Sequence, residues 1–246
     1  MKISVAMAAY NGSAYIREQI DSILSQLSGE DELVVSDDGS TDGTRELLEQ
    51  WCASEARLRV LSGPRQGLQQ NFAHALDACT GDILFLSDQD DRWAPGKVER
   101  VAAIFQARPE VMAVLHDAAL VDGQMHPLGG NMFALRDSRP GFWKNLWKNS
   151  YMGSCMAFRR ELLQVALPIP EGLPMHDQWL GMLAEQVGEV ALLPEPLLLY
   201  RRHAATVTVD KHGSLATMVR NRARLLAALT ARRGAVRAYR RRRARA

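Results

Sequence analysis

The sequence of 246 residues lacks the long apolar run, the paired cysteines and the biased composition that mark special classes of protein. No apolar stretch approaches the roughly 20 residues that a membrane-spanning helix needs. The apolar start at residues 3–9 is short and breaks at Tyr10, which predicts a first β-strand and not a signal peptide. The three cysteines are widely spaced and form no C-x-x-C pair, which favours reduced thiols in a cytoplasmic protein. With 47% hydrophobic and 24% charged residues, the composition excludes a disordered or fibrous chain.

Three common motifs for binding nucleotides or catalytic metal ions are also absent. There is no G-x-G-x-x-G after the first predicted strand, no G-x-x-x-x-G-K-[ST] and no H-E-x-x-H. These absences exclude the usual dinucleotide site, the P-loop and the zinc-protease helix. A nucleotidyltransferase is disfavoured as well, because no Gly-rich loop with basic residues for a triphosphate lies near the first strand.

Acidic residues are missing from the end of the chain. Residues 211–246 hold Lys211 and 11 arginines but no Asp or Glu, a formal charge of +12. Residues 1–210 hold 18 basic and 28 acidic side chains, a formal charge of −10. The pooled net charge of +2 therefore hides an acidic body and a strongly basic tail.

Within the tail, Ser214 can cap a helix in which apolar residues share one face and arginines lie largely off it. Such a helix suits the surface of an anionic membrane. Two alternatives remain open: the apolar face docks on the body of the protein, or the arginines form a solvated end. Nucleic-acid binding through the arginines is a fourth interpretation, which the acidic body disfavours.

The first half of the chain alternates between short apolar runs and segments with helical spacing. The runs that predict buried strands are residues 3–9, 33–36, 58–61, 83–86 and 111–115. This alternation predicts the α/β class: an open, mostly parallel sheet with helices on both faces. Ligands of such sheets bind at the carboxyl ends of the strands.

Weaker signals predict the remaining elements. Ser40 or Thr41 is expected to cap the helix after the second strand. The other expectations are a helix at 69–78, a helix opened by Pro95, a loop over 122–150, a strand at 151–158, and helices at 160–166 and 177–187.

Clustered carboxylates follow two of the predicted strands. Asp88, Asp90 and Asp91 end the fourth strand, and the pair Asp37 and Asp38 ends the second. Like charges this close resist ionisation, and a divalent cation removes that difficulty. Hard oxygen ligands suit Mg²⁺ or Mn²⁺, which then bridge to phosphate groups of a substrate. The alternative is a solvated acidic turn that caps the helix after Pro95. Because the nucleotide motifs above are absent, a metal-dependent nucleotide site indicates an enzyme that uses nucleotide-sugars.

Several segments, taken in order, make the sequence resemble the family-2 glycosyltransferases, which have the GT-A fold. They are Ile3 to Asn11, Val35 to Thr44, Gly67 with Asn71, Phe85 to Trp93, Met175 to Trp179, and Tyr200 to His203. The variants D-Q-D-D-x-W, H-D-x-W and Y-R-x-H resemble the rhamnosyltransferase-like branch of bacterial surface-polysaccharide enzymes. The resemblance implies a GT-A domain over residues 1–210, with a nucleotide-sugar-binding half at 1–121 and an acceptor-side half at 122–210. The basic helical tail at 211–246 follows it.

The resemblance also implies roles on the donor side. The implied nucleotide-sugar-binding residues are Ala8, Tyr10, Asn11, Asp38, Asn71 and Asp88. Asp90 would bind the Mn²⁺ or Mg²⁺ that grips the diphosphate, and His203 would be a further contact to the metal or a phosphate. Asp91 would either contact the acceptor or hold the metal-binding residues in position.

On the acceptor side, Asp177 is the candidate general base for an inverting single displacement. A carboxylate takes the proton of the attacking hydroxyl in such a reaction. His176 would contact the acceptor, and Gly153 would form the floor of the acceptor site. The alternative for Asp177 is a residue that caps the following helix.

The predicted function is a metal-dependent glycosyltransferase of polysaccharide assembly, with dTDP-rhamnose as the expected donor and a UDP-sugar as the alternative. The acceptor would be a glycan or a lipid-linked glycan. The expected location is the cytoplasm, peripheral to the inner face of the membrane through residues 214–246. A nucleic-acid-binding protein is the alternative from a different class.

Overall fold

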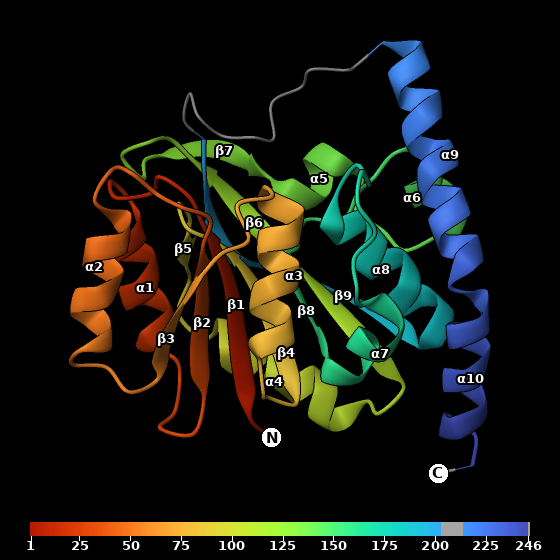
Figure 1. The fold of residues 1–246 in the computed structure, drawn as a ribbon, viewed down its shortest axis with the longest axis horizontal. Coiled ribbons are helices and arrows are strands. Elements are labelled where there is room, and N and C mark those ends of the chain that lie inside the picture. The colour runs from red at the N-terminus through yellow and green to blue at the C-terminus, as the bar shows by residue number, and fades with distance from the viewer. Residues whose placement is uncertain (203–213, 246) are drawn as a thin grey trace.

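The computed structural model describes residues 1–202 and 214–245 (Figure 1). Its strands are β1 (Ile3–Ala9), β2 (Glu32–Asp37), β3 (Leu58–Ser62), β4 (Ile83–Asp88), β5 (Arg92–Trp93), β6 (Val111–Val121), β7 (Pro127–Asn131), β8 (Met156–Arg159) and β9 (Glu189–Arg201). Together they form one sheet in the order β3-β2-β1-β4-β8-β6-β9-β5, with β7 paired to β6. Apolar side chains fill the centre: β1 and the first five residues of β4 are buried along their whole length.

Helices cover both faces of this sheet. They are α1 (Ile16–Leu24), α2 (Thr44–Cys52), α3 (Leu68–Ala78), α4 (Lys97–Ala107), α5 (Met132–Arg136), α6 (Phe142–Trp147), α7 (Leu163–Ala166), α8 (His176–Val187), α9 (Leu215–Ala231) and α10 (Arg233–Arg243). Figure 1 shows α3 in front of the sheet and α4 behind it. Helix α3 packs on β1 and β2, and α8 packs on β6 and β9.

The first four of the five strands predicted in the first half of the chain are parallel neighbours, and the fifth, at 111–115, begins β6. Strand β1 lies between β2 and β4, and β3 extends the sheet beyond β2. The expected parallel sheet is therefore confirmed for β1 to β4. The second half is mixed, because β8 runs antiparallel to both β4 and β6 while β9 runs parallel to β6.

Three local expectations are wrong. Gly43 is the N-cap of α2, so neither Ser40 nor Thr41 caps it; Ser40 instead donates to Asp37. The segment 122–150 is not a loop throughout, since it contains β7, α5 and α6. Residues 153–155 form a 3₁₀ turn, so the strand expected at 151–158 shortens to β8.

The basic tail forms two consecutive helices, and Ser214 accepts a hydrogen bond from the backbone N–H of Thr217 at the predicted cap (3.3 Å). The apolar face of the tail packs on the body through Leu225, Leu229, Val236 and Tyr239, which are buried. Docking on the body is thus the interpretation that the structure confirms for this part of the tail. The domain boundary expected at residue 210 lies outside the described residues.

Among the described helices, none combines the length and the apolar character that crossing a bilayer requires.

Candidate active site

The carboxyl ends of β1, β2 and β4 meet at one edge of the sheet. Ala8 is paired with Ser36 on one side and with Asp88 on the other, and Ala9 is paired with Asp37. Parallel register therefore brings the polar ends of the three strands side by side, as their positions in the sequence predicted. Ala8 itself is buried, so its contribution to a pocket is its backbone and a methyl group.

The loop after β1 presents an aromatic side chain to solvent. The Gln89 side chain holds this loop through two hydrogen bonds to the backbone of Tyr10, both at 2.8 Å. Its Oε1 accepts from the N–H of Tyr10, and its Nε2 donates to the carbonyl of Tyr10. Asn11, at φ +50°, accepts from the N–H of Thr41 at 2.8 Å. The Tyr10 ring is 57% exposed above the strand ends, where it can stack on a planar ligand.

Two of the predicted donor-side residues hold the backbone. Asp38 accepts from the N–H groups of Arg65 (2.6 Å) and Gly67 (2.9 Å), which shapes the turn before α3. Asn71 is 1% exposed and donates to the carbonyls of Ala9 (3.2 Å) and Ser36 (2.8 Å). The structure therefore places Asn71 beneath the strand ends as their support, while Asp38 lies partly exposed beside them.

The acidic turn after β4 concentrates negative charge. The pKa of Asp88 is raised to about 7 by burial of its carboxyl group and by the nearby charges of Asp90 and Asp177, while Lys97 lowers it. Asp90 lies in the same turn and is partly exposed. This geometry resists full ionisation, so a cation at the turn would stabilise the charged form.

Asp91 faces the interior. It is fully buried, one carboxylate oxygen accepts from the backbone N–H of Arg201 at 3.1 Å, and the other has no hydrogen-bond partner. Burial and the charges of Asp90 and Asp88 hold its pKa well above the usual range. In the structure Asp91 lies beneath the turn and contacts the backbone at the end of β9.

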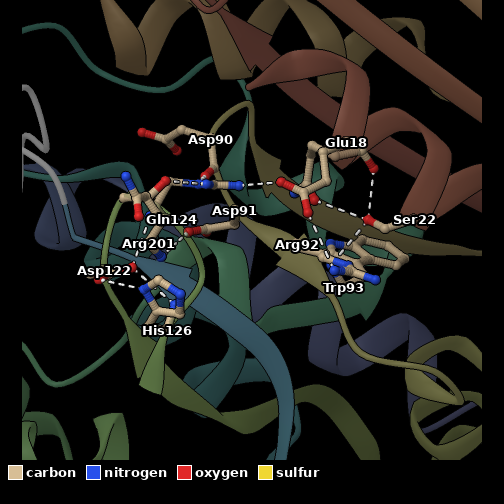
Figure 2. A network of polar contacts seen from close by, with 12 residues as sticks. Glu18, Ser22, Asp90, Asp91, Arg92, Trp93, Asp122, Gln124, His126 and Arg201 are labelled. Atoms are coloured by element: carbon tan, nitrogen blue, oxygen red, sulfur yellow. Dashed lines mark hydrogen bonds and ion pairs between the residues drawn. The ribbon is translucent and has the colours of Figure 1, made fainter. Parts of the chain in front are cut away.

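Arg201, at the end of β9, ties the acidic turn to the rest of the site (Figure 2). Its guanidinium donates to the carbonyl oxygens of Asp90 (2.8 Å) and Gly123 (2.6 Å) and pairs with Glu18. It is 4% exposed and also lies over the Tyr15 ring, 4.7 Å from its centroid. In Figure 2 it lies between the Asp90 turn and Glu18, so it fixes the backbone that presents Asp90.

An Arg201→Gln variant is expected to unfold at lower temperature, with a loss of about 2–3 kcal/mol in the free energy of unfolding. The reason is that buried carbonyls lose charge-assisted hydrogen bonds, each of which is worth roughly 1.5–3 kcal/mol. Thermal denaturation without ligand measures the loss, and Arg202→Gln at the exposed neighbouring position is the matched control. Equal midpoints for the two variants would contradict this role for Arg201.

A fully buried lysine underlies the same turn. Lys97, the first residue of α4, donates from Nζ to the carbonyl of Ser154 at 2.9 Å and lies 4.0 Å from the centroid of the Trp93 ring. Burial lowers its pKa to about 7, against the opposing effect of Asp91 and Asp88. The lysine connects the acidic turn to the 153–155 turn on the opposite side of the site.

Asp177 lies on that opposite side, in the first turn of α8. One carboxylate oxygen accepts from Asn149 Nδ2 at 2.9 Å and from the N–H of Gln178 at 2.6 Å. The other accepts from the N–H of Gly153 at 3.2 Å. The N-cap of α8 is Met175, so Asp177 is not the capping residue that the alternative required. Three donors fix the orientation of this carboxylate.

His176 lies beside the same turn with unused hydrogen-bonding capacity. It is 3% exposed, it stacks on Phe72 with ring centroids 4.2 Å apart, and neither ring nitrogen has a partner. Burial lowers its pKa, which keeps the ring neutral. A Cβ atom added at Gly153 would lie 2.9 Å from His176 Nε2, so the glycine leaves the space in front of that nitrogen. The predicted trio of Gly153, His176 and Asp177 is therefore brought together.

The side chains available as metal ligands fit a cation that arrives with a substrate. Among residues 1–202 and 214–245, no three His, Cys, Asp or Glu side chains are arranged to hold a metal ion. Mg²⁺ and Mn²⁺ need only one or two carboxylates when phosphates and waters supply the remaining ligands. Asp90 in a turn of raised carboxyl pKa values meets that need. His203, the second predicted contact, lies outside the described residues.

Three supporting residues were not predicted from the sequence: Lys97, Asn149 and Arg201. Arg201 stands in the Y-R-x-H segment, so the resemblance was a signal that could have found it. Lys97 begins the helix directly after the acidic turn, which is also a readable signal, because clustered carboxylates attract a cationic neighbour. Asn149 gives none, since only tertiary packing brings it to Asp177.

Comparison with known proteins identifies a family and relatives of this chain. The chain matches the family model described as Glycosyl transferase family 2 over residues 4–166. An uncharacterized glycosyltransferase of Nostoc sp. is 30% identical over 214 residues, which cover 83% of this chain and 66% of that protein.

Solved structures show the same fold. A crystal structure of S. aureus TarS 1–349 in complex with UDP-GlcNAc has a TM-score of 0.67 at 23% identity, covering 84% of this chain and 60% of that one. The mannosyltransferase PcManGT from Pyrobaculum calidifontis, in complex with GDP-Man and Mn²⁺, has a TM-score of 0.61 at 24% identity, covering 80% and 56%. The chain thus spans 56–66% of the length of these three proteins. The fold is GT-A, as the sequence predicted.

Proposed function

Because the chain belongs to glycosyl transferase family 2, we propose that it transfers a sugar from a nucleotide-sugar donor to a hydroxyl group of a glycan or lipid-linked acceptor in bacterial polysaccharide assembly. One observation carries the proposal. The 153–155 turn links the Asp88–Asp91 turn to Asp177. Lys97, which lies over the Trp93 ring next to the acidic turn, donates to the carbonyl of Ser154, and the N–H of Gly153 donates to the Asp177 carboxylate. The charge of Asp177 is also among the causes that raise the pKa of Asp88. A leaving diphosphate and an attacking hydroxyl need such groups on opposite sides of the transferred sugar.

On the donor side, the exposed Tyr10 ring would stack on the base, with Asn11 and the backbone of Ala8 lining the base and ribose pocket. Asp38 would lie near the base and Asp88 near the ribose. Asn71 contributes by holding the ends of β1 and β2. These roles rest on the position of each residue at the strand ends.

Asp90 would hold the divalent cation, with His203 as a further contact, and Asp91 would support the turn. A bound Mg²⁺ or Mn²⁺ would supply positive charge to the leaving diphosphate. The Mn²⁺ in the PcManGT complex supports metal use by analogy of fold. Arg201 and Lys97 keep the acidic turn in place.

Asp177 would accept the proton of the acceptor hydroxyl while that oxygen attacks the anomeric carbon and the nucleoside diphosphate leaves from the other face. Configuration is inverted in such a single displacement. The N–H of Gly153 and the amide of Asn149 donate to the carboxylate, and these hydrogen bonds fix its orientation. The neutral His176 ring would contact the acceptor through a nitrogen that has no protein partner.

We propose dTDP-rhamnose as the donor, supported by the D-Q-D-D-x-W, H-D-x-W and Y-R-x-H segments of the sequence. A UDP-sugar is the alternative, since TarS is a structural neighbour solved with UDP-GlcNAc. We also propose the domain limits inferred from the sequence, residues 1–210 and 211–246. The location proposed is the cytoplasmic side of the membrane, in contact with it through the tail.

A thermal-shift panel tests the function. We expect Mn²⁺ together with dTDP or dTDP-rhamnose to stabilise the protein by roughly 2.7 kcal/mol at 100 times the dissociation constant. UDP, GDP and CMP with Mn²⁺ are the matched comparisons, and each nucleotide with a chelator is the metal control.

A shift with UDP in place of dTDP would keep the chemistry and change the donor. Shifts that persist unchanged in the chelator would contradict metal use. No shift with any nucleotide in the presence of metal would contradict the proposed activity itself.

A further inference from the structure

The structure leaves a cluster of large apolar side chains in solvent beside the tail. On α6, Trp143 is 75% exposed and Trp147 is 72% exposed. On the first turns of α9, Leu215 is 80% exposed and Val219 is 64% exposed. We call these four residues the tryptophan surface. Contiguous apolar patches of this kind on a soluble body mark interaction sites.

The two helices that carry these residues are neighbours. Figure 1 shows α6 beside α9, and the two helices contact each other. Arg222 of α9 donates to the carbonyl of Trp147 at 2.6 and 3.1 Å, and its guanidinium lies over the Trp147 ring, 4.3 Å from the centroid. Arg222 therefore holds the Trp147 side chain in place at the surface, and Trp143 lies edge-on to the Phe142 ring of the same helix.

Docking of the tail uses only part of its apolar stripe. Leu225 and Leu229 face the body and are buried, whereas Leu215, Val219 and the partly exposed Leu226 lie on the adjacent side of α9. Since residues 215, 219 and 226 share a helix side at 3.6 residues per turn, α9 has a second apolar strip on its solvent-exposed flank, beside the face that packs on the body.

The charge around this strip has one sign. Residues 214–245 contain 11 arginines and no Asp or Glu. Arg220 and Arg224 are exposed on α9, and Lys148 is exposed directly after α6. Exposed tryptophans with leucines and cations match the interface of an anionic bilayer, where indole rings sit at headgroup level. A nucleic acid would use the arginines but not the leucine and valine side chains.

The tryptophan surface is joined to the acceptor side of the site. Asn149, two residues after Trp147, donates to the Asp177 carboxylate at 2.9 Å. Gln178, the neighbour of Asp177, donates to the carbonyl of Asn145 within α6 at 2.5 Å. A partner bound to α6 would therefore lie next to the proposed general base.

We propose that the tryptophan surface, with the arginines of α9, docks the protein on an anionic phospholipid bilayer. It follows that Asp177 works at the membrane surface on an amphiphilic, lipid-linked acceptor. This second statement rests on the proposed glycosyltransferase function, whereas the docking does not.

Co-sedimentation with vesicles tests the docking. We expect the wild-type protein to bind phosphatidylcholine vesicles that contain phosphatidylglycerol, and to bind pure phosphatidylcholine vesicles far less. The double variant W143A, W147A should lose binding about tenfold or more, because interfacial tryptophans would be removed. Both side chains are exposed, so the fold should survive. Leu128→Ala, at an exposed leucine on β7, is the matched control and should bind as wild type does.

Charge is tested separately. The double variant R220Q, R224Q should weaken binding to phosphatidylglycerol vesicles, and R237Q, R241Q on exposed positions of α10 should weaken it less.

Equal binding of W143A, W147A and wild type would overturn the proposal. So would a wild-type dimer that W143A, W147A converts to a monomer, because a second copy would then be the occupant. Vesicle binding is measured without donor, and the nucleotide thermal shift is read on the same variants. Loss of one signal with the other intact therefore separates the docking from the enzymatic proposal.

Discussion

An Asp177→Asn variant is expected to lose transfer activity by about 10²–10⁴-fold in kcat, the usual contribution of a general base. Asparagine is nearly isosteric and its carbonyl oxygen can still accept one of the hydrogen bonds from Asn149 and Gly153. What it lacks is the ability to take a proton from the acceptor hydroxyl. The proposed donor site lies at the strand ends of β1, β2 and β4, away from this carboxylate, so the dissociation constant of the donor nucleotide should stay within a few-fold of wild type.

The measurement pairs initial rates under saturating donor with the metal-dependent thermal shift of the donor nucleotide. Asp137→Asn is the matched control, since Asp137 is an exposed carboxylate at φ +51°, a conformation that asparagine also accepts. A variant at position 177 that transfers sugar at the wild-type rate would remove Asp177 from the role of base. Parallel loss of donor binding would move it to the donor side.

Asn149→Ala should give a smaller loss than Asp177→Asn because Asn149 only orients the carboxylate. Gly153 and Gln178 still donate to it when the amide is gone. The difference in activity loss between the two variants thus distinguishes Asp177, the group proposed to react, from Asn149, which orients it.

The part of the site built on β1, β2 and β4 could be predicted because its geometry follows from local patterns. Each strand is a short apolar run, parallel pairing aligns the ends, and Asp38 and Asp88 follow those ends directly. No long-range information beyond the rule for parallel sheets was needed. The same reasoning could not distinguish residues that face a ligand from residues that hold the backbone. Asn71 is an example, because it was predicted to bind the nucleotide-sugar and instead donates to the carbonyls of Ala9 and Ser36.

The second half resisted prediction for physical reasons. Strand β9 contains Pro194 and Pro196, which argue against a strand in a central position. The sheet accommodates them with a register shift, since His116 is opposite Leu193 while the next residue, Asp117, is opposite Pro196. The two intervening residues of β9 bulge out of the pairing. The two prolines are compatible with an edge strand, a bulge or a loop, so the local pattern alone does not distinguish these outcomes.

Lys97 and Arg201 share another reason for escaping prediction. Each is a basic residue whose burial depends on distant segments of the chain. The segment of Ser154 covers the lysine, and those of Glu18 and Gly123 cover the arginine. The sequence positions of both residues can mark them as candidates, but the sequence does not show that either side chain is buried. Their burial beside carboxylates depends on the tertiary fold. It distinguishes the Asp88–Asp91 turn, which is held in place by buried cations, from an acidic turn that is only solvated.

An Asp90→Asn variant is expected to lose the metal-dependent part of donor binding. The stabilisation of roughly 2.7 kcal/mol that Mn²⁺ and nucleotide give together at 100 times the dissociation constant should fall to near zero. Transfer should fall by about 10³-fold or more, because a metal ion contributes several kcal/mol to stabilising the leaving charge. The amide removes the charge of Asp90, which is partly exposed and whose carboxylate points away from Asp91 in Figure 2.

Asp122→Asn provides the matched control, because Asp122 is a neighbouring carboxylate in Figure 2 that only accepts hydrogen bonds from Gln124 and His126. An asparagine carbonyl keeps those bonds, so the metal response should remain. Removal of Asp90 also removes one of the charges that raise the pKa values of Asp88 and Asp91, so the metal-free variant should be no less stable than wild type. A variant that is as stable as wild type, binds no metal with the nucleotide and transfers no sugar would assign the cation to Asp90. Retention of the metal response would instead place the cation on another residue, and this account of the acidic turn would be wrong.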